Sequence, residues 1–144
     1  MNLDDVRAGL CAVPAFAKLP SAMVERVGMA LLRVGAVRSL EIGETLFVEG
    51  DDRGDMGCVL LKGEVEVFRE KAEPTRCPAP DLLGEMQQLA PTAQRTATVQ
   101  ATQPATVLEF RWHDFVIAAS TVLSQTEQIQ LKDTVLQLSD KRRQ

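Results

Sequence analysis

Six of the nine glycines in this 144-residue chain fall between residues 37 and 110, where they separate short apolar or alternating runs. Residues 64–67 and 96–101 alternate with a period of two, which is typical of strands with one buried face. Residues 59–61 and 107–108 are wholly apolar and suit the centres of buried strands. Short strands divided by glycines predict a barrel or roll.

The segment 70–80 interrupts this pattern with three prolines, Pro74, Pro78 and Pro80. Proline has no backbone N–H to donate to a neighbouring strand, so the segment is not a central strand. We therefore predict a surface hairpin tip over these residues.

Helical patterns flank the strand-rich region on both sides. From residue 3 to about residue 34, apolar residues recur at spacings of three and four, and Leu19-Pro20-Ser21 marks a helix start. From residue 113 to about residue 141 the chain contains no glycine or proline, which predicts one long helix. His113 and Asp114 are expected to cap its start rather than to act in catalysis.

The C-terminal helical stretch carries two apolar stripes on different faces. The first contains Val122, Ile129 and Leu136, and the second contains Leu131, Val135 and Leu138. Two apolar faces need two partners, and we expect these to be the strands and either a second copy of the chain or another protein. The alternative is a break near Ser124, after which the helix folds back and both faces are buried within one molecule.

Composition bounds the class of protein. The length and the hydrophobic content of 45% suit one globular domain with a substantial core. A net charge of -4 and a pI near 5.0 argue against nucleic-acid binding, which depends on Lys and Arg. The basic tract at 141–143 is expected to complete a helix C-terminus.

The sequence predicts no metal site, no catalytic site and no membrane segment. Three widely spaced cysteines and one histidine argue against a metal or iron–sulfur site. No Ser/His/Asp set and no Walker-type loop is present, so we expect no enzyme and no catalytic residues. The acidic N-terminus and the lack of a long apolar run predict no signal peptide, no membrane span and a cytoplasmic location with reduced thiols. Cys58 is expected to be a small buried hydrophobe and Cys77 a loop thiol.

A series of ordered motifs extends over residues 16–115. They are Leu19-Pro20, Gly43-Glu44-Thr45-Leu46-Phe47, Glu49-Gly50-Asp51, Gly54-Asp55, Leu61-Lys62-Gly63-Glu64-Val65, Gly84-Glu85, Arg95-Thr96-Ala97-Thr98-Val99 and Phe115. In this set the chain resembles the cyclic nucleotide-binding domain family, which includes the effector domains of bacterial Crp/Fnr-type regulators. The resemblance implies an α+β, mainly β fold: an eight-stranded antiparallel β-roll (jelly roll) with N-terminal helices and a long C-terminal helix. We expect one domain, with a helical segment at 1–36, the roll at 37–112 and the C-terminal helix at 113–144.

Within the roll, residues 84–96 resemble the family's phosphate-binding cassette. Gly84 allows close backbone approach at the start of a short helix, whose amides and dipole suit an anion. Arg95 would bind the cyclic phosphate by a charge-assisted contact, and Glu85 would accept a hydrogen bond from the ribose 2'-hydroxyl. The alternative is that Glu85 and Arg95 pair with each other across a loop.

The sequence assigns less definite roles to the other residues expected at the ligand. Met86 and Gln87 continue the cassette, and Thr96 would donate to the phosphate or to a guanine amino group, or else be an ordinary strand residue. In the family the purine is covered by the C-terminal helix, which makes Thr134, Leu138 and Ser139 the candidates for base contacts. The chain departs from the family pattern at Pro80, Gln87, Gln88 and Gln94, and at Cys58 in place of an aromatic residue.

The resemblance therefore implies a regulatory module that binds cyclic AMP or cyclic GMP and alters its C-terminal helix. No other cofactor is expected. The output would be a homodimer through that helix, or a protein partner. We expect no helix-turn-helix domain after the helix and therefore no DNA binding by this chain alone. The alternatives are a ligand-free scaffold for protein contacts, and an effector fragment of a Crp/Fnr-type transcription factor.

Overall fold

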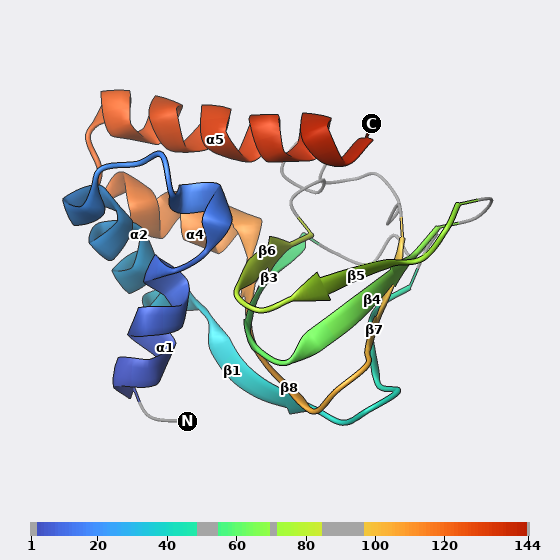
Figure 1. The fold of residues 1–144 in the computed structure, drawn as a ribbon. Helices are drawn as coiled ribbons and strands as arrows, with labels where there is room; N and C mark the ends of the chain where they lie inside the picture. Colours follow the sequence, from blue (N-terminus) through green and yellow to red (C-terminus); the bar gives the residue numbers. More distant parts are fainter. Residues whose placement is uncertain (1–2, 49–54, 70–71, 85–96, 144) are drawn as a thin grey trace.

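The computed structural model describes residues 3–48, 55–69, 72–84 and 97–143, and for residues 3 and 138–143 the backbone alone. The chain begins with helix α1 (Leu3–Cys11), the 3-10 turn η1 (Pro14–Phe16) and helix α2 (Ser21–Val34). Within the described residues eight strands follow, and after them come α4 (Trp112–Ser120) and α5 (Gln125–Arg143). Helices thus lie on both sides of the strand region in sequence, and Figure 1 shows α1, α2 and α4 on one side of the strands and α5 across the top.

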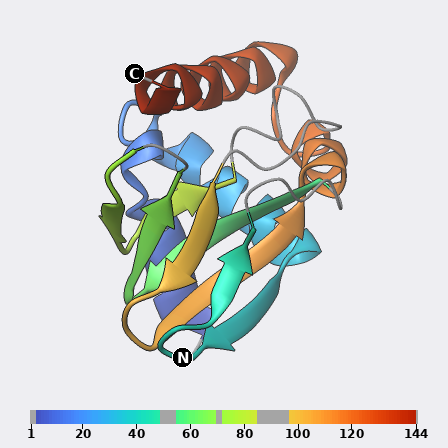
Figure 2. The ribbon, with the colours of Figure 1, turned by 90° about the vertical axis from the view of Figure 1, so that its right-hand side faces the viewer.

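The strands form two four-stranded antiparallel sheets. The first has the order β1-β8-β3-β6, and the second has the order β2-β7-β4-β5. Their bounds are β1 (Ala36–Leu40), β2 (Thr45–Phe47), β3 (Met56–Lys62), β4 (Glu64–Phe68), β5 (Thr75–Pro78), β6 (Asp81–Leu83), β7 (Thr98–Ala101) and β8 (Ala105–Arg111). The two sheets face each other (Figures 1 and 2), which confirms the predicted mainly β roll with N-terminal helices and a long C-terminal helix.

Glycine sets the sharp turn between β3 and β4. Gly63 has φ of 94°, in the left-handed region that side chains disfavour. A Cβ at this position would lie 2.6 Å from the carbonyl oxygen of Pro104, so there is also no room for one. This turn carries the chain from the first sheet to the second, because β3 and β4 belong to different sheets.

The prediction of a hairpin tip over residues 70–80 is wrong for its second half. Residues 75–78 form β5, which pairs with β4 from Thr75 opposite Val67 to Pro78 opposite Glu64. β5 lies at the edge of its sheet and pairs with β4 alone. The missing N–H of Pro78 therefore breaks no hydrogen bond to a second neighbouring strand. Cys77 therefore lies on a strand and not in a loop, and its thiol donates to Asp81 Oδ2 at 3.0 Å.

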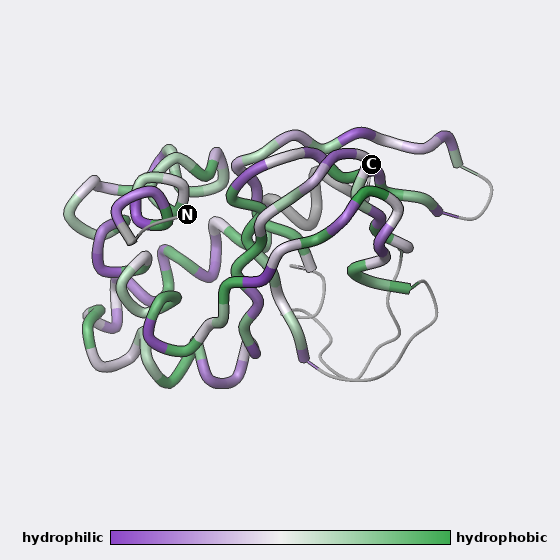
Figure 3. Tube along the Cα trace, turned by 90° about the horizontal axis from the view of Figure 1, so that it is seen from below, coloured by the Kyte–Doolittle hydropathy of each residue, from purple (hydrophilic) through white to green (hydrophobic). Residues whose placement is uncertain are grey.

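Two apolar clusters stabilise the molecule. One lies between the helices and the first sheet, and its fully buried members include Leu10, Met23, Val27, Leu31 and Phe110. The other lies between the two sheets and includes Leu40, Cys58, Leu60, Val65 and Val107. Hydrophobic and hydrophilic stretches alternate along the chain, as these half-buried elements require (Figure 3). Cys58 is fully buried, as predicted for a small hydrophobe.

The C-terminal stretch is not one uninterrupted helix, and that prediction is wrong. α4 ends at Ser120, a turn follows, and α5 begins at Gln125, so the break near Ser124 that the alternative predicted is present. The burial of both apolar faces that it also predicted is wrong, because Ile129 is 62% exposed. After the break, Leu131 and Val135 return to the helical core and are 6% and 3% exposed. In Figures 1 and 2, α5 lies across the end of the roll. Among the described residues, no helix has the length and apolar content needed to cross a membrane.

Candidate functional site

Gly84 is the first residue of the expected cassette, and it follows directly on β6. Its φ is 78°, so the chain leaves the sheet in a conformation that glycine tolerates and other residues disfavour. The other predicted cassette residues, Glu85, Met86, Gln87, Arg95 and Thr96, lie outside the described residues. The structure therefore places the start of the cassette, and the roles of those five residues stay predictions.

The carbonyl of Gly84 accepts a hydrogen bond from the first residue of α4. Trp112, the first residue of α4, donates its indole N–H to Gly84 O at 3.0 Å. The Trp112 side chain is otherwise buried, with 3% of the residue exposed. Since a buried indole N–H needs a partner, this bond fixes α4 to the point where the cassette begins.

The start of α4 is capped from a distant segment. Asp55 accepts two hydrogen bonds there: its carbonyl from Trp112 N at 2.9 Å, and its Oδ2 from His113 N at 2.8 Å. The prediction that His113 and Asp114 cap this helix is wrong, because the capping carboxylate comes from the segment before β3. The sequence did not point to Asp55 as the cap. Aspartate is a favoured N-cap residue, but Asp55 is far from the helix in sequence.

Three aromatic rings secure the same helix start. The ring centroids of Phe110 and Trp112 are 4.9 Å apart in an edge-to-face arrangement, and Phe115 lies 5.7 Å from Phe110. Gly57 on β3 makes room for them, because a Cβ there would come within 2.6 Å of the Phe110 ring and 2.8 Å of Trp112 Nε1. Strand β3, strand β8 and α4 are therefore closely packed at this point.

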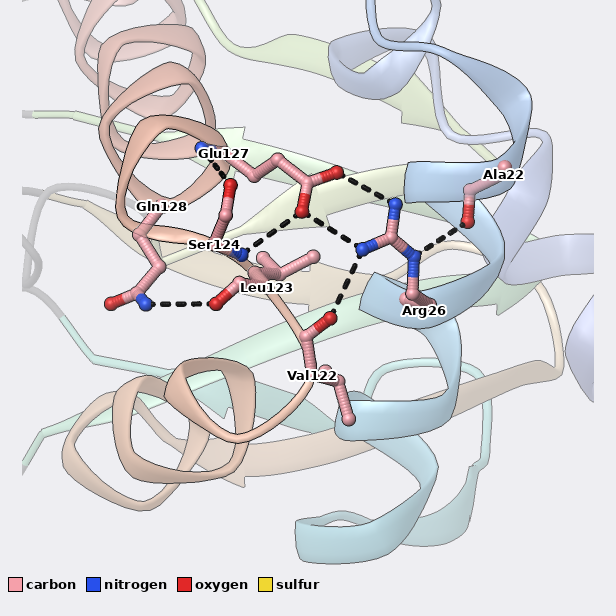
Figure 4. A network of polar contacts seen from close by, with 7 residues as sticks. All are labelled: Ala22, Arg26, Val122, Leu123, Ser124, Glu127 and Gln128. Atoms are coloured by element: carbon pink, nitrogen blue, oxygen red, sulfur yellow. Dashed lines mark hydrogen bonds and ion pairs between the residues drawn. The ribbon is translucent and has the colours of Figure 1, made fainter.

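The second helical joint lies where α5 meets α2 (Figure 4). Arg26 on α2 makes a bidentate contact with Glu127 on α5, through bonds of 2.8 Å to Oε1 and 2.6 Å to Oε2. The same guanidinium donates to Val122 O at 3.0 Å, in the turn between α4 and α5. A planar guanidinium can satisfy a carboxylate and a carbonyl together, so Arg26 holds both the turn and the start of α5.

Glu127 also completes the N-terminal cap of α5. Ser124 N donates to Glu127 Oε1 at 2.9 Å, and Glu127 N donates to Ser124 Oγ at 3.1 Å. This reciprocal pair is a capping box, and its sequence signal, Ser-x-x-Glu at 124–127, would have located the helix break. The hydrogen bonds from Arg26 and from Ser124 N lower the pKa of Glu127 from 4.5 to about 2.

The three residues predicted to contact a base lie on α5. Thr134 is half-buried, and its hydroxyl donates to Gln130 O at 2.9 Å, within the helix. Leu138 and Ser139 fall in the C-terminal part of α5, and their side chains lie outside the described part of the chain. The side chains of α5 that reach the core are Leu131 and Val135. The roles of Thr134, Leu138 and Ser139 as base contacts stay predictions.

Comparisons with known proteins agree with this architecture. The family model described as cyclic nucleotide-binding domain matches residues 37–121, which is more than half of the chain. No curated protein sequence matches the chain.

Solved structures show the same fold. The Thermus thermophilus catabolite activator protein has a TM-score of 0.66 and 23% identity, over 90% of this chain and 57% of its own. The N-terminal domain of a transcriptional regulator from Streptomyces coelicolor A3(2) has a TM-score of 0.64 and 23% identity, over 92% of both chains. A protein described with a cyclic-GMP-dependent signalling pathway that regulates bacterial phytopathogenesis has a TM-score of 0.63 and 20% identity, over 79% of this chain and 88% of its own. The chain thus spans little more than half of the Thermus protein.

Proposed function

The chain belongs to the cyclic nucleotide-binding domain family, and from this we propose that it is a regulatory module that binds cyclic AMP or cyclic GMP through residues 84–96. In this proposal binding at the cassette changes how the C-terminal helices are held. The output is a contact made by those helices, either with a second copy of the chain or with another protein.

One observation carries the proposal: the hydrogen bond from Trp112 to Gly84 O. It joins the residue where the cassette begins to the first residue of the C-terminal helices. A ligand that repositions the backbone at Gly84 changes the acceptor that holds α4. Asp55 and the aromatic rings hold the residues at the start of α4 together. We therefore expect a backbone shift at Gly84 to move the start of α4 as a unit.

The cassette residues supply the ligand chemistry in this proposal. Arg95 binds the cyclic phosphate, and Glu85 accepts from the ribose hydroxyl. Met86 and Gln87 are further ligand contacts in this proposal, and Thr96 donates to the phosphate or to guanine. The neighbouring protein connected with cyclic-GMP signalling makes cyclic GMP one of the two ligands to test.

The contact between α2 and α5 defines the resting position of the output helix. Arg26 holds Glu127 and Val122 there, while Leu131 and Val135 supply the buried contacts of α5. A nucleotide shifts α5 only to the extent that it binds more tightly to one helix position than to the other. The exposed side chain of Ile129 is available to a partner on the outer face of α5.

Calorimetry and thermal denaturation with cyclic AMP, cyclic GMP and cyclic di-GMP test the proposal. We expect one of the two mononucleotides to bind and to raise the melting temperature. Arg95→Ala should weaken binding about ten- to hundredfold, since a hydrogen bond to a charged group contributes about 1.5–3 kcal/mol. Arg76→Ala, at an exposed arginine of β5, is the matched control and should bind as the wild type does.

The result also separates the proposal from the ligand-free scaffold. If millimolar cyclic AMP and cyclic GMP leave the melting temperature of the wild type unchanged, the domain does not act as a nucleotide sensor. A partner contact through the helices would then be constitutive.

A further inference from the structure

Side chains of α4 and α5 line an apolar groove. Its volume is about 310 Å³, which is at the lower end of the range typical of small-molecule pockets. The floor consists of buried side chains from both helices. They are Trp112, Phe115, Ala119, Leu131 and Val135.

The walls of the groove are apolar and open to solvent. Val116 on α4 is 46% exposed and Ile129 on α5 is 62% exposed, and both line the groove. Large aliphatic side chains at this exposure lose contact with water when an apolar molecule covers them. The concave floor between them, with the small side chain of Ala119 at its base, suits a slim aliphatic chain.

Two polar side chains of α5 lie at the rim. Among the described residues that line the groove, Lys132 is the only charged one, and it is exposed. Gln128 uses one N–H of its amide to bind Leu123 O at 3.1 Å (Figure 4), which leaves the second N–H to donate. In a chain of net charge -4, an ammonium and an amide donor beside an apolar groove favour one anionic head group.

From this arrangement we propose that the α4–α5 groove binds a small amphiphile with an aliphatic body and a carboxylate head, of the medium-chain fatty-acid class. The aliphatic body lies on Trp112 and Phe115 between Val116 and Ile129, and the carboxylate lies at Lys132. The ligand bridges α4 and α5, so it stabilises the folded-back position of α5. The inference does not rest on nucleotide binding, and its test contains no nucleotide.

Trp112 is the only tryptophan of the chain and forms part of the groove floor, so its fluorescence reports occupancy directly. Hexanoate, octanoate and decanoate are titrated into the full chain below their micellar concentrations. We expect a saturable change in Trp112 emission and an affinity that rises about threefold to fourfold per added methylene until the groove is filled. Absence of a saturable change, or an affinity independent of chain length, overturns the proposal.

Variants then separate the head-group and groove contacts, with calorimetry as the readout. Lys132→Glu should weaken octanoate binding roughly threefold or more and leave octanol binding unchanged, whereas Lys18→Glu should alter neither. Val116→Trp fills the groove and should abolish binding. Ile117→Trp is its control, because Ile117 is 54% exposed on the same helix but does not line the groove.

A second copy of the chain could cover this groove instead of the fatty acid. Sedimentation of the wild type and of Val116→Trp measures this self-association. A wild-type dimer that Val116→Trp converts to a monomer, together with no binding of octanoate, would show that a second copy covers the groove and would overturn the proposal. Equal weakening of octanoate binding in Val116→Trp and Ile117→Trp would also overturn it.

Discussion

Trp112 donates its indole N–H to the carbonyl oxygen of Gly84 at 3.0 Å, which joins the start of α4 to the start of the cassette. Replacing the indole with a phenyl ring in Trp112→Phe removes this donor but keeps an aromatic side chain. We expect the free energy of unfolding to fall by about 1–2 kcal/mol, from the lost hydrogen bond and the unpaired carbonyl. Denaturant unfolding followed by circular dichroism measures this change.

The same variant tests the coupling between the cassette and α4. Phe110→Leu is the control, because it alters the same aromatic cluster without removing a hydrogen bond. If Trp112→Phe binds nucleotide with the affinity of Phe110→Leu, the bond to Gly84 has no part in ligand binding.

Acid should weaken the joint between α2 and α5. The pKa of Glu127 is lowered to about 2 by its hydrogen bonds to Arg26 and Ser124. A carboxylate with a depressed folded pKa stabilises the fold above its unfolded pKa, and this contribution is lost as pH falls. The wild type should therefore be more stable than Glu127→Gln at pH 7, and the difference should shrink between pH 4.5 and pH 2. Thermal unfolding across this range is the measurement, and a constant difference would contradict the assignment.

Ser124 caps α5, and Ser124→Ala should lower the free energy of unfolding by about 1 kcal/mol. Ser120→Ala is the matched control: the Ser120 hydroxyl is exposed and bonds within its own helix to Ile117 O. The control should change stability by less than about 0.5 kcal/mol. Equal effects of the two substitutions would show that the break at 121–124 does not depend on this cap.

The two glycines Gly57 and Gly28 should respond in opposite directions to alanine. A Cβ at Gly57 would meet the Phe110 ring at 2.6 Å, so Gly57→Ala must displace an aromatic side chain and should cost about 1–3 kcal/mol. Gly28 lies inside α2, and a Cβ there meets Leu10 at an ordinary 3.6 Å. Gly28→Ala should stabilise the protein by about 0.5–1 kcal/mol. Chemical denaturation of both variants checks the two signs.

Short-range patterns predicted much of the fold. The alternation at 64–67 and the apolar run at 59–61 are β4 and the buried centre of β3. The three prolines of the segment 70–80 exclude a central strand and therefore predict a tip, yet an edge strand tolerates Pro78 at its end. The uninterrupted helix was predicted because residues 113–141 lack glycine and proline, whereas the break is set by the capping box of Ser124 and Glu127.

At the candidate site, too, some features follow from the local sequence and others from contacts between distant residues. The sequence by itself determined the strand and helix periods, the glycine at position 84 and the motifs that place the chain in its family, because each period and each motif is a short local run of residues. Only the tertiary structure decided which distant groups meet: Trp112 with Gly84, 28 residues apart, and Arg26 with Glu127, 101 residues apart. The partner of the Trp112 indole or of the Arg26 guanidinium depends on how the whole chain packs, and no local pattern encodes it.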